Sequence, residues 1–269
     1  MGRRKRNIPE ACCYHVTHRC HGRSFLFKFD IDRQNYINRL REMNEKFPVD
    51  VLNYIVTSNH IHLLLWSSSG SYISQAMHFL QSTTAKDYNQ RIGREGAFWS
   101  NRYHPTLIEP GNHLSRCIFY IDFNMVRAKA VEHPFDWKYS GCHELAGIRK
   151  RYRIINLDCL LNCLGFSNKN LFFKWYNAVV EKEAEKTSHL RQAIWSKALA
   201  VGRKEWIEDL SSGLLRTKIS PVVTEEYERY EQSGQNTSSF AVNEPKPIYG
   251  LYGTNTTKKE LWKKHLKNS

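Results

Sequence analysis

Apolar residues recur along the first part of the chain with two different periods. Four short segments are rich in apolar and β-branched residues and are bounded by polar turns, which predicts strands. Three longer segments repeat their apolar residues every three to four positions, which predicts helices. The order β-α-β-β-α-β-α predicts an α+β fold, a ferredoxin-like antiparallel sheet with helices and one added helix. The expected strands are 11–17, 50–56, 60–66 and one within 99–109, and the expected helices are 30–45, 72–91 and 112–130.

The pattern changes beyond about residue 145. Two aromatic-rich segments, 170–183 and 189–199, have helical spacing, and a polar tail from about residue 219 has too little apolar content to pack by itself. We therefore expect a domain of residues 1–145 that contains the sheet. Residues 146–269 are expected to form an accessory helical region with a partly disordered tail.

The net charge and the cysteines narrow the class of protein. A formal net charge of +14 favours a polyanionic partner, because lysine and arginine side chains release counterions from phosphates, although a basic protein without a nucleic-acid role remains an alternative.

The seven cysteines form an odd set without paired CxxC spacing, so we expect reduced thiols, no zinc site and a cytoplasmic protein. The chain has no apolar run long enough to cross a membrane, so no membrane partner is expected.

Two histidines in one expected strand are the first candidates for chemistry. Residues two apart in a strand point to the same face, so His60 and His62 present both imidazoles to one side, while Ile61 and Leu63 point to the other. Two neutral imidazoles suit a divalent ion whose other positions are taken by an oxygen ligand, water and phosphate. The alternative is a pair of hydrogen-bonded histidines in a sheet.

The expected helix 112–130 has an unusual polar stripe. One face is apolar and the other carries a phenol that can attack phosphorus, a carboxamide that can bind a metal, and guanidiniums that can hold phosphates. The alternative is a tyrosine at the edge of the core with solvated neighbours. The stripe consists of His113, Arg116, Tyr120, Asn124 and Arg127.

Four motifs together resemble a known family. They are Tyr14-His-Val-Thr-His-Arg19, His60-Ile-His-Leu-Leu-Leu65, Phe98-Trp-Ser-Asn-Arg-Tyr103 and Tyr120-Ile-Asp-Phe-Asn-Met-Val-Arg-Ala128. In this order they resemble the transposases with an HUH motif and a single tyrosine, and most of all the REP-associated tyrosine transposases. The resemblance extends over about residues 7–145.

The resemblance implies a mechanism and a partner. Tyr120 corresponds to the nucleophile, and His60, His62 and Asn124 correspond to the ligands of a divalent metal, Mg²⁺ or Mn²⁺. The family cleaves and rejoins single-stranded or hairpin DNA in transposition, through a 5′-phosphotyrosine link and a free 3′-OH. This chain has Met125 where the family commonly has proline, which leaves the ligands in place.

Further residues are candidates for DNA contact, each with a solvated surface charge or a core position as its alternative. Arg102 and Tyr103 have the chemistry to hold a phosphate and to stack on an unpaired base. Two other functions stay open: a protein that binds DNA hairpins without cleaving them, and a metal phosphoesterase that uses water. The protein is expected to be a monomer or a homodimer. The candidate DNA-binding residues are His15, Arg19, Lys86, Arg102, Tyr103, Arg116 and Arg127.

Overall fold

The structure is a computed structural model, which describes residues 11–186 and 192–210. Its centre is a five-stranded sheet in the order β2-β3-β1-β4-β5. The first four strands are antiparallel, as predicted, and this order is that of a ferredoxin-like sheet. The short β5 was not predicted and pairs in parallel with β4. The strands are β1 (Cys12–Arg19), β2 (Val49–Val56), β3 (His60–Ser67), β4 (His104–Ile108) and β5 (Ala200–Val201).

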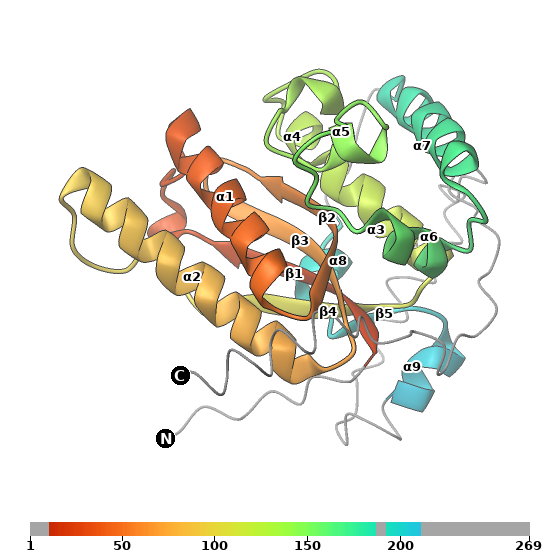
Figure 1. The fold of residues 1–269 in the computed structure, drawn as a ribbon, viewed down its shortest axis with the longest axis horizontal. Helices are drawn as coiled ribbons and strands as arrows, with labels where there is room; N and C mark the ends of the chain where they lie inside the picture. Colours follow the sequence, from red (N-terminus) through yellow and green to blue (C-terminus); the bar gives the residue numbers. More distant parts are fainter. Residues whose placement is uncertain (1–10, 187–191, 211–269) are drawn as a thin grey trace.

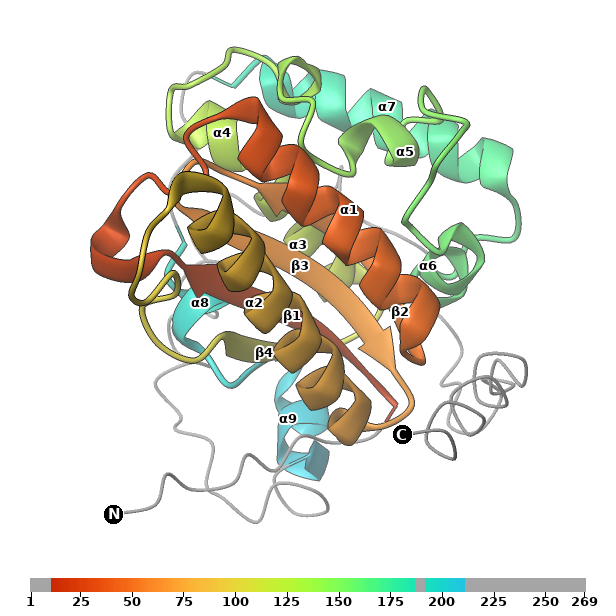
Figure 2. The same cartoon turned by 60° about the vertical axis from the view of Figure 1, so that its left-hand side comes forward.

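Helices cover both faces of the sheet (Figure 1). Helices α1 (Asp30–Lys46) and α2 (Gly70–Ile92) lie side by side on one face, whereas α3 (Asn112–Asp122) and α6 (Leu157–Leu164) pack against the other (Figure 2). The helices α1 and α2 confirm the helices predicted over 30–45 and 72–91, and α6 was not among the predicted helices. The remaining elements are η1 (His21–Arg23), α4 (Asn124–Arg127), η2 (Pro134–Asp136), α5 (Cys142–Leu145), α7 (Lys169–Ala184), α8 (Ile194–Lys197) and α9 (Lys204–Leu210).

Polar residues and glycines define where two of these helices begin and end. The Ser69 side chain accepts the Ser71 N–H at the start of α2, and Gly93 ends that helix in the left-handed conformation, at φ 62°. At α6, the Asn156 side chain accepts the Cys159 N–H at 3.1 Å. Each cap satisfies backbone groups that the helix itself leaves unpaired.

The predicted helix 112–130 is interrupted. Phe123 has φ −81° and ψ 11° between α3 and α4, so Tyr120 lies in the last turn of one helix and Asn124 at the start of the next. The side chain of Arg127 reaches back and donates to the Tyr120 carbonyl oxygen at 2.5 Å. A side chain thus satisfies a carbonyl at the end of α3, where intrahelical partners run out.

The residues after 145 share the hydrophobic core of the sheet. Leu160, Phe172 and Tyr176 belong to the same buried cluster as the strands. The Tyr176 hydroxyl donates to the Asp122 carboxylate at 2.7 Å, and Asn53 Nδ2 donates to the same carboxylate at 2.9 Å. The division into 1–145 and 146–269 stays a prediction, and α7 is joined to α3 across it.

Several other expectations have a definite outcome. The predicted helix 170–183 is α7, but the predicted helix 189–199 contains only α8, with extended backbone at Ala198 and residues 187–191 outside the described part. All seven cysteines lie in the described part of the chain, and none of them forms a disulfide there. The polar tail from residue 219 lies outside the described residues. Within the described residues, no helix combines the length and apolar character needed to cross a membrane.

Candidate active site

His15, His60 and His62 lie on one face of the sheet beside α3, and His104 on β4, opposite Thr17, lies on the same face. His60 and His62 on β3 lie opposite Arg19 and Thr17 on β1, and His15 is two residues from Thr17 on the same strand. Because side chains alternate between faces, all of these point to one side of the sheet. This is the side that α3 covers (Figure 2). The sheet therefore brings the HxH pair under the helix with the candidate nucleophile.

His62 is the centre of this cluster and is 4% exposed. Its Nδ1 lies 2.8 Å from Nε2 of His15, and its Nε2 lies 3.1 Å from Nδ2 of Asn124. The planes of the His15 and His62 rings are within 11° of parallel, with centroids 5.0 Å apart. Both ring nitrogens of His62 thus face polar partners from different elements.

His60 is held at the start of β3 by the hairpin link. Its Nδ1 lies 2.7 Å from Oδ1 of Asn59 and 2.9 Å from Oγ1 of Thr57. The amide oxygen of Asn59 accepts only, so it requires a proton on Nδ1 and leaves the lone pair on Nε2. The rings of His60 and His62 meet edge to face, 5.1 Å between centroids.

Tyr120 lies over the histidines. Its ring centroid is 5.9 Å from that of His62 and 6.1 Å from that of His15, and 8% of the residue is exposed. The guanidinium of Arg127 lies 4.1 Å from the centroid of the Tyr120 ring, within the range of a cation–π contact. The same guanidinium bonds the Tyr120 carbonyl, so Arg127 fixes the backbone and the ring together.

The segment around α8 completes the cluster. The ring of Trp195 packs at a tilt against Tyr120, 5.8 Å between centroids, and the Trp195 carbonyl lies 2.7 Å from Nδ1 of His15. The Ala198 carbonyl accepts from Thr106 Oγ1 on β4 at 2.9 Å, which anchors the segment to the sheet. Sequence reasoning missed Trp195, because a tryptophan in an expected helix far along the chain carries no signal for this position.

Burial keeps the inner histidines neutral. It lowers the pKa of His15 to about 3, and it lowers the pKa of His62 well below its ordinary value. His113, also buried, has its pKa lowered to about 4 by desolvation, and it faces Glu109 and not the cluster. Neutral imidazoles keep a lone pair for a metal ion or a hydrogen bond.

The expected DNA-binding residues do not all lie in one place. Arg19 is exposed, opposite His60, and Arg116 is half-buried one turn before Tyr120, so both lie near the cluster. Arg127 is half-buried and holds Tyr120. Arg102 is exposed in the loop before β4.

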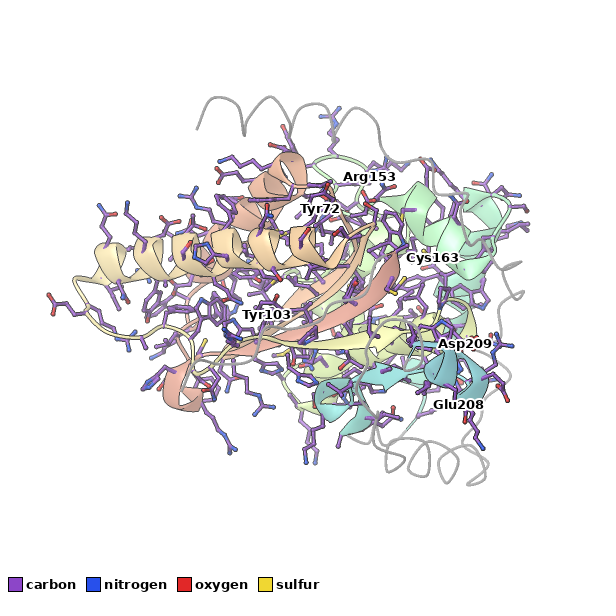
Figure 3. All side chains as sticks on the ribbon, turned by 90° about the horizontal axis from the view of Figure 1, so that it is seen from below. Tyr72, Tyr103, Arg153, Cys163, Glu208 and Asp209 are labelled. Carbon is purple, nitrogen blue, oxygen red and sulfur yellow. The ribbon has the colours of Figure 1, made fainter. Side chains whose placement is uncertain are left out.

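Two of the remaining three candidates are buried, and the DNA contact of the third, Lys86, stays a prediction. Lys86 is exposed on α2, and α2 lies on the other face of the sheet from α3, which carries Tyr120 (Figure 1). Tyr103 is 7% exposed and packs in the core beside the sheet (Figure 3), so its ring does not offer a face to a base. His15 is fully buried, with each ring nitrogen within hydrogen-bond distance of a partner, so its ring is not open to solvent.

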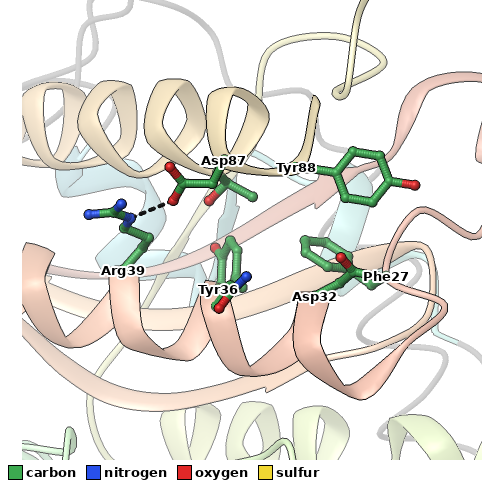
Figure 4. A pocket seen from close by; sticks show the side chains of 8 residues that line it. Phe27, Asp32, Tyr36, Arg39, Asp87 and Tyr88 are labelled. Atoms are coloured by element: carbon green, nitrogen blue, oxygen red, sulfur yellow. Dashed lines mark hydrogen bonds and ion pairs between the residues drawn. The ribbon is translucent and has the colours of Figure 1, made fainter. Parts of the chain in front are cut away.

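A pocket elsewhere on the molecule is unrelated to this cluster. It lies between α1 and α2, where Arg39 and Asp87 form an ion pair at 2.6 Å (Figure 4). Tyr36 and Phe27 also line it. The sheet separates α1 and α2, which line this pocket, from α3, which carries Tyr120 (Figure 2).

The donor atoms of the cluster fit a divalent cation. His60 and His62 offer imidazole nitrogens, and Asn124 offers an amide oxygen once its side chain turns. Among the residues that the structure describes, no group of three or more histidine, cysteine, aspartate or glutamate residues could hold a metal ion. The Asn124 amide, 3.1 Å from Nε2 of His62, is therefore the candidate for a third protein ligand beside the two histidines.

Comparison with known proteins finds a family model that matches part of the chain. Residues 9–123 match the family described as transposase IS200 like. The match confirms the expected resemblance for these residues, which include the HxH pair and Tyr120 and end just before Asn124. A solved structure of the REP-associated tyrosine transposase bound to a REP hairpin is similar at 19% identity, with a TM-score of 0.46, over 57% of this chain and 90% of that chain. The comparison with curated proteins found no match.

Proposed function

We propose that this chain is a metal-dependent single-stranded DNA endonuclease and strand transferase, a transposase whose nucleophile is Tyr120. Its substrate class is single-stranded DNA that folds into hairpins. The observation that supports this most is the contact of the Tyr120 ring with His62, whose Nε2 lies 3.1 Å from Asn124. A phenol, two imidazoles and an amide thus converge from a helix, a strand and a second helix.

The reaction conserves the energy of the phosphodiester bond. The Tyr120 oxygen forms a bond to phosphorus as the bond to the 3′ oxygen breaks, which leaves a 5′-phosphotyrosine and a free 3′-OH. The phenol loses its proton and the departing 3′ oxygen gains one. Because the covalent intermediate keeps the bond energy, a 3′-OH can later reverse the step and join strands without ATP.

The surrounding side chains each have a task in this proposal. The Arg127 guanidinium, 4.1 Å from the ring centroid, holds the ring in place and favours negative charge developing on the phenol oxygen. Arg19 and Arg116 supply positive charge for the DNA backbone. A divalent ion bound by His60, His62 and Asn124 would neutralise charge on the phosphate oxygens, and imidazole ligands favour Mn²⁺ over the harder Mg²⁺.

A covalent-adduct assay tests the proposal. Fluorescent single strands that contain a hairpin with randomised flanks are incubated with the full chain and Mn²⁺, and adducts are separated under denaturing conditions. We expect an adduct with the unmodified chain and none with Tyr120→Phe. The substitution removes one oxygen and keeps the ring, so stability should change by no more than about 1 kcal/mol.

Tyr72→Phe is the matched control, because Tyr72 is half-buried on α2, across the sheet from the site (Figure 3). It should leave adduct formation unchanged. Cleavage by Tyr120→Phe at the unmodified rate would identify a phosphoesterase that uses water. Tight hairpin binding without cleavage by the unmodified chain would identify a non-cleaving DNA-binding protein.

A further inference from the structure

A chain of hydrogen bonds connects the α8 segment to the metal-ligand candidates. It runs from the Trp195 carbonyl to His15, from His15 to His62 and from His62 to Asn124, with distances of 2.7, 2.8 and 3.1 Å. His15 and His62, the two histidines in this series of hydrogen bonds, are 0% and 4% exposed, so water does not offer them other partners. The donor and the acceptor in each of these hydrogen bonds follow from the Trp195 carbonyl, which can only accept.

The carbonyl of Trp195 decides the direction. A carbonyl oxygen accepts and never donates, so Nδ1 of His15 must carry the proton in the bond of 2.7 Å. A neutral imidazole has one proton, which leaves Nε2 of His15 as an acceptor. In the bond of 2.8 Å, Nδ1 of His62 must then be the donor. The lone pair of His62 therefore lies on Nε2, on the side of Asn124.

The other contacts agree with this direction. Nδ2 of Asn124 is a donor and lies 3.1 Å from Nε2 of His62, which as a lone-pair nitrogen accepts. The near-parallel planes of the His15 and His62 rings direct the in-plane proton of one ring at the in-plane lone pair of the other. His60 has the same tautomer by a separate bond to Asn59.

We propose that His15 is a positioning residue of the site: held by the Trp195 carbonyl, it accepts the Nδ1–H of His62 and so presents the His62 Nε2 lone pair to Asn124 and to a divalent ion. This inference rests on the proposed function for its metal ion. In this proposal His15 orients His62 from below the metal site, whereas the sequence predicted that His15 contacts DNA. It also makes the α8 segment a structural part of the site.

Nuclear magnetic resonance of the metal-free full chain tests the tautomer directly. With ¹⁵N-labelled histidine, protonated and unprotonated ring nitrogens give separate signals, and the signals of His15 and His62 are assigned by substitution. We expect both residues to be protonated at Nδ1. A proton on Nε2 of His62 would overturn the inference, whether or not the protein cleaves DNA.

Mn²⁺ binding to variants gives the second measurement. His15→Phe keeps a ring of similar size but removes both nitrogens, and the Mn²⁺ dissociation constant should rise about tenfold to a hundredfold, as for other residues that orient a metal ligand. His15→Gln retains an amide that can accept from His62 and donate to the carbonyl, so its affinity should stay close to that of the unmodified chain. Equal affinity of His15→Phe and the unmodified chain would overturn the proposal.

A second histidine on the same strand is the control. His18 is 3% exposed and its Nε2 also bonds a backbone carbonyl, that of Asn101, but it stacks on Trp99 on the opposite face of the sheet. His18→Phe should leave Mn²⁺ affinity unchanged, and an equal loss in both variants would show a general structural effect and refute a specific role of His15. An unmodified chain with the expected tautomers but no covalent adduct would refute the proposed function and leave this inference standing.

Discussion

Asp122 should make the stability of this protein decrease as pH rises. It is 1% exposed and lies between Asn53 on β2 and Tyr176 on α7, two residues after the candidate nucleophile. Desolvation raises the pKa of its carboxyl from 3.8 to about 7, although both hydrogen bonds and the charge of Arg127 act to lower it. The carboxyl is therefore protonated in the folded chain at a pH where it is ionised in the unfolded chain.

The sign and the size follow from proton linkage. Between the unfolded and folded pKa values the folded chain binds the extra proton, so stability is fully present at low pH and is lost as pH rises toward 7. A difference of about three pKa units corresponds to roughly 4 kcal/mol, at about 1.4 kcal/mol for each unit. Asp122→Asn cannot ionise, and its amide can still accept from Asn53 and donate to the Tyr176 hydroxyl.

Urea unfolding at several pH values measures this effect. Relative to the unmodified chain, Asp122→Asn should gain about 3 kcal/mol between pH 5 and pH 8, which corresponds to roughly 10 °C in Tm. Titration of the buried histidines is common to both proteins and cancels in the difference. Asp158→Asn, on the exposed start of α6, should show no such gain. Parallel pH profiles of Asp122→Asn and the unmodified chain would refute the reasoning.

Two further predictions concern the metal site and the accessory region. Asn124→Ala should weaken Mn²⁺ binding less than His62→Ala does, because water can replace a neutral amide. Excess Mn²⁺ should therefore restore adduct formation by Asn124→Ala. If no Mn²⁺ concentration restores it, Asn124 has a structural role. A fragment of residues 1–145 should not fold cooperatively, because it lacks Leu160, Phe172 and Tyr176 from the shared core. Calorimetry would show this as the absence of a melting transition, and a sharp transition would contradict it.

Periodicity was sufficient to predict the elements that contain the main candidates. Alternation over 60–66 predicted β3 with both histidines on one face, and helical spacing predicted α1 and α2 within two residues at either end. These patterns are local: a residue's side of a strand or helix depends on positions two to four residues away. Helical spacing also predicted the polar stripe that includes Tyr120, whereas its role as candidate nucleophile came from the resemblance of its motif to a family.

The surroundings of these residues depend on contacts between distant segments. His15 was expected at the DNA and lies beneath His62, because Trp195 closes that face of the sheet 180 residues later in the chain. Tyr103 was expected to stack on a base and is in the core, because burial depends on what packs above a position and not on its neighbours in sequence.

The sequence by itself determined the order of the strands and helices from β1 to α3, the shared face of His60 and His62, and the spacing of Tyr120 and Asn124. Only the tertiary structure decided that α3 ends at Phe123, that β5 joins the sheet and that Trp195 reaches His15. The physical reason is the distance along the chain over which each kind of interaction acts. Periodicity reports on backbone geometry over one or two turns, whereas hydrogen-bond partners and desolvation are set when remote segments pack against each other.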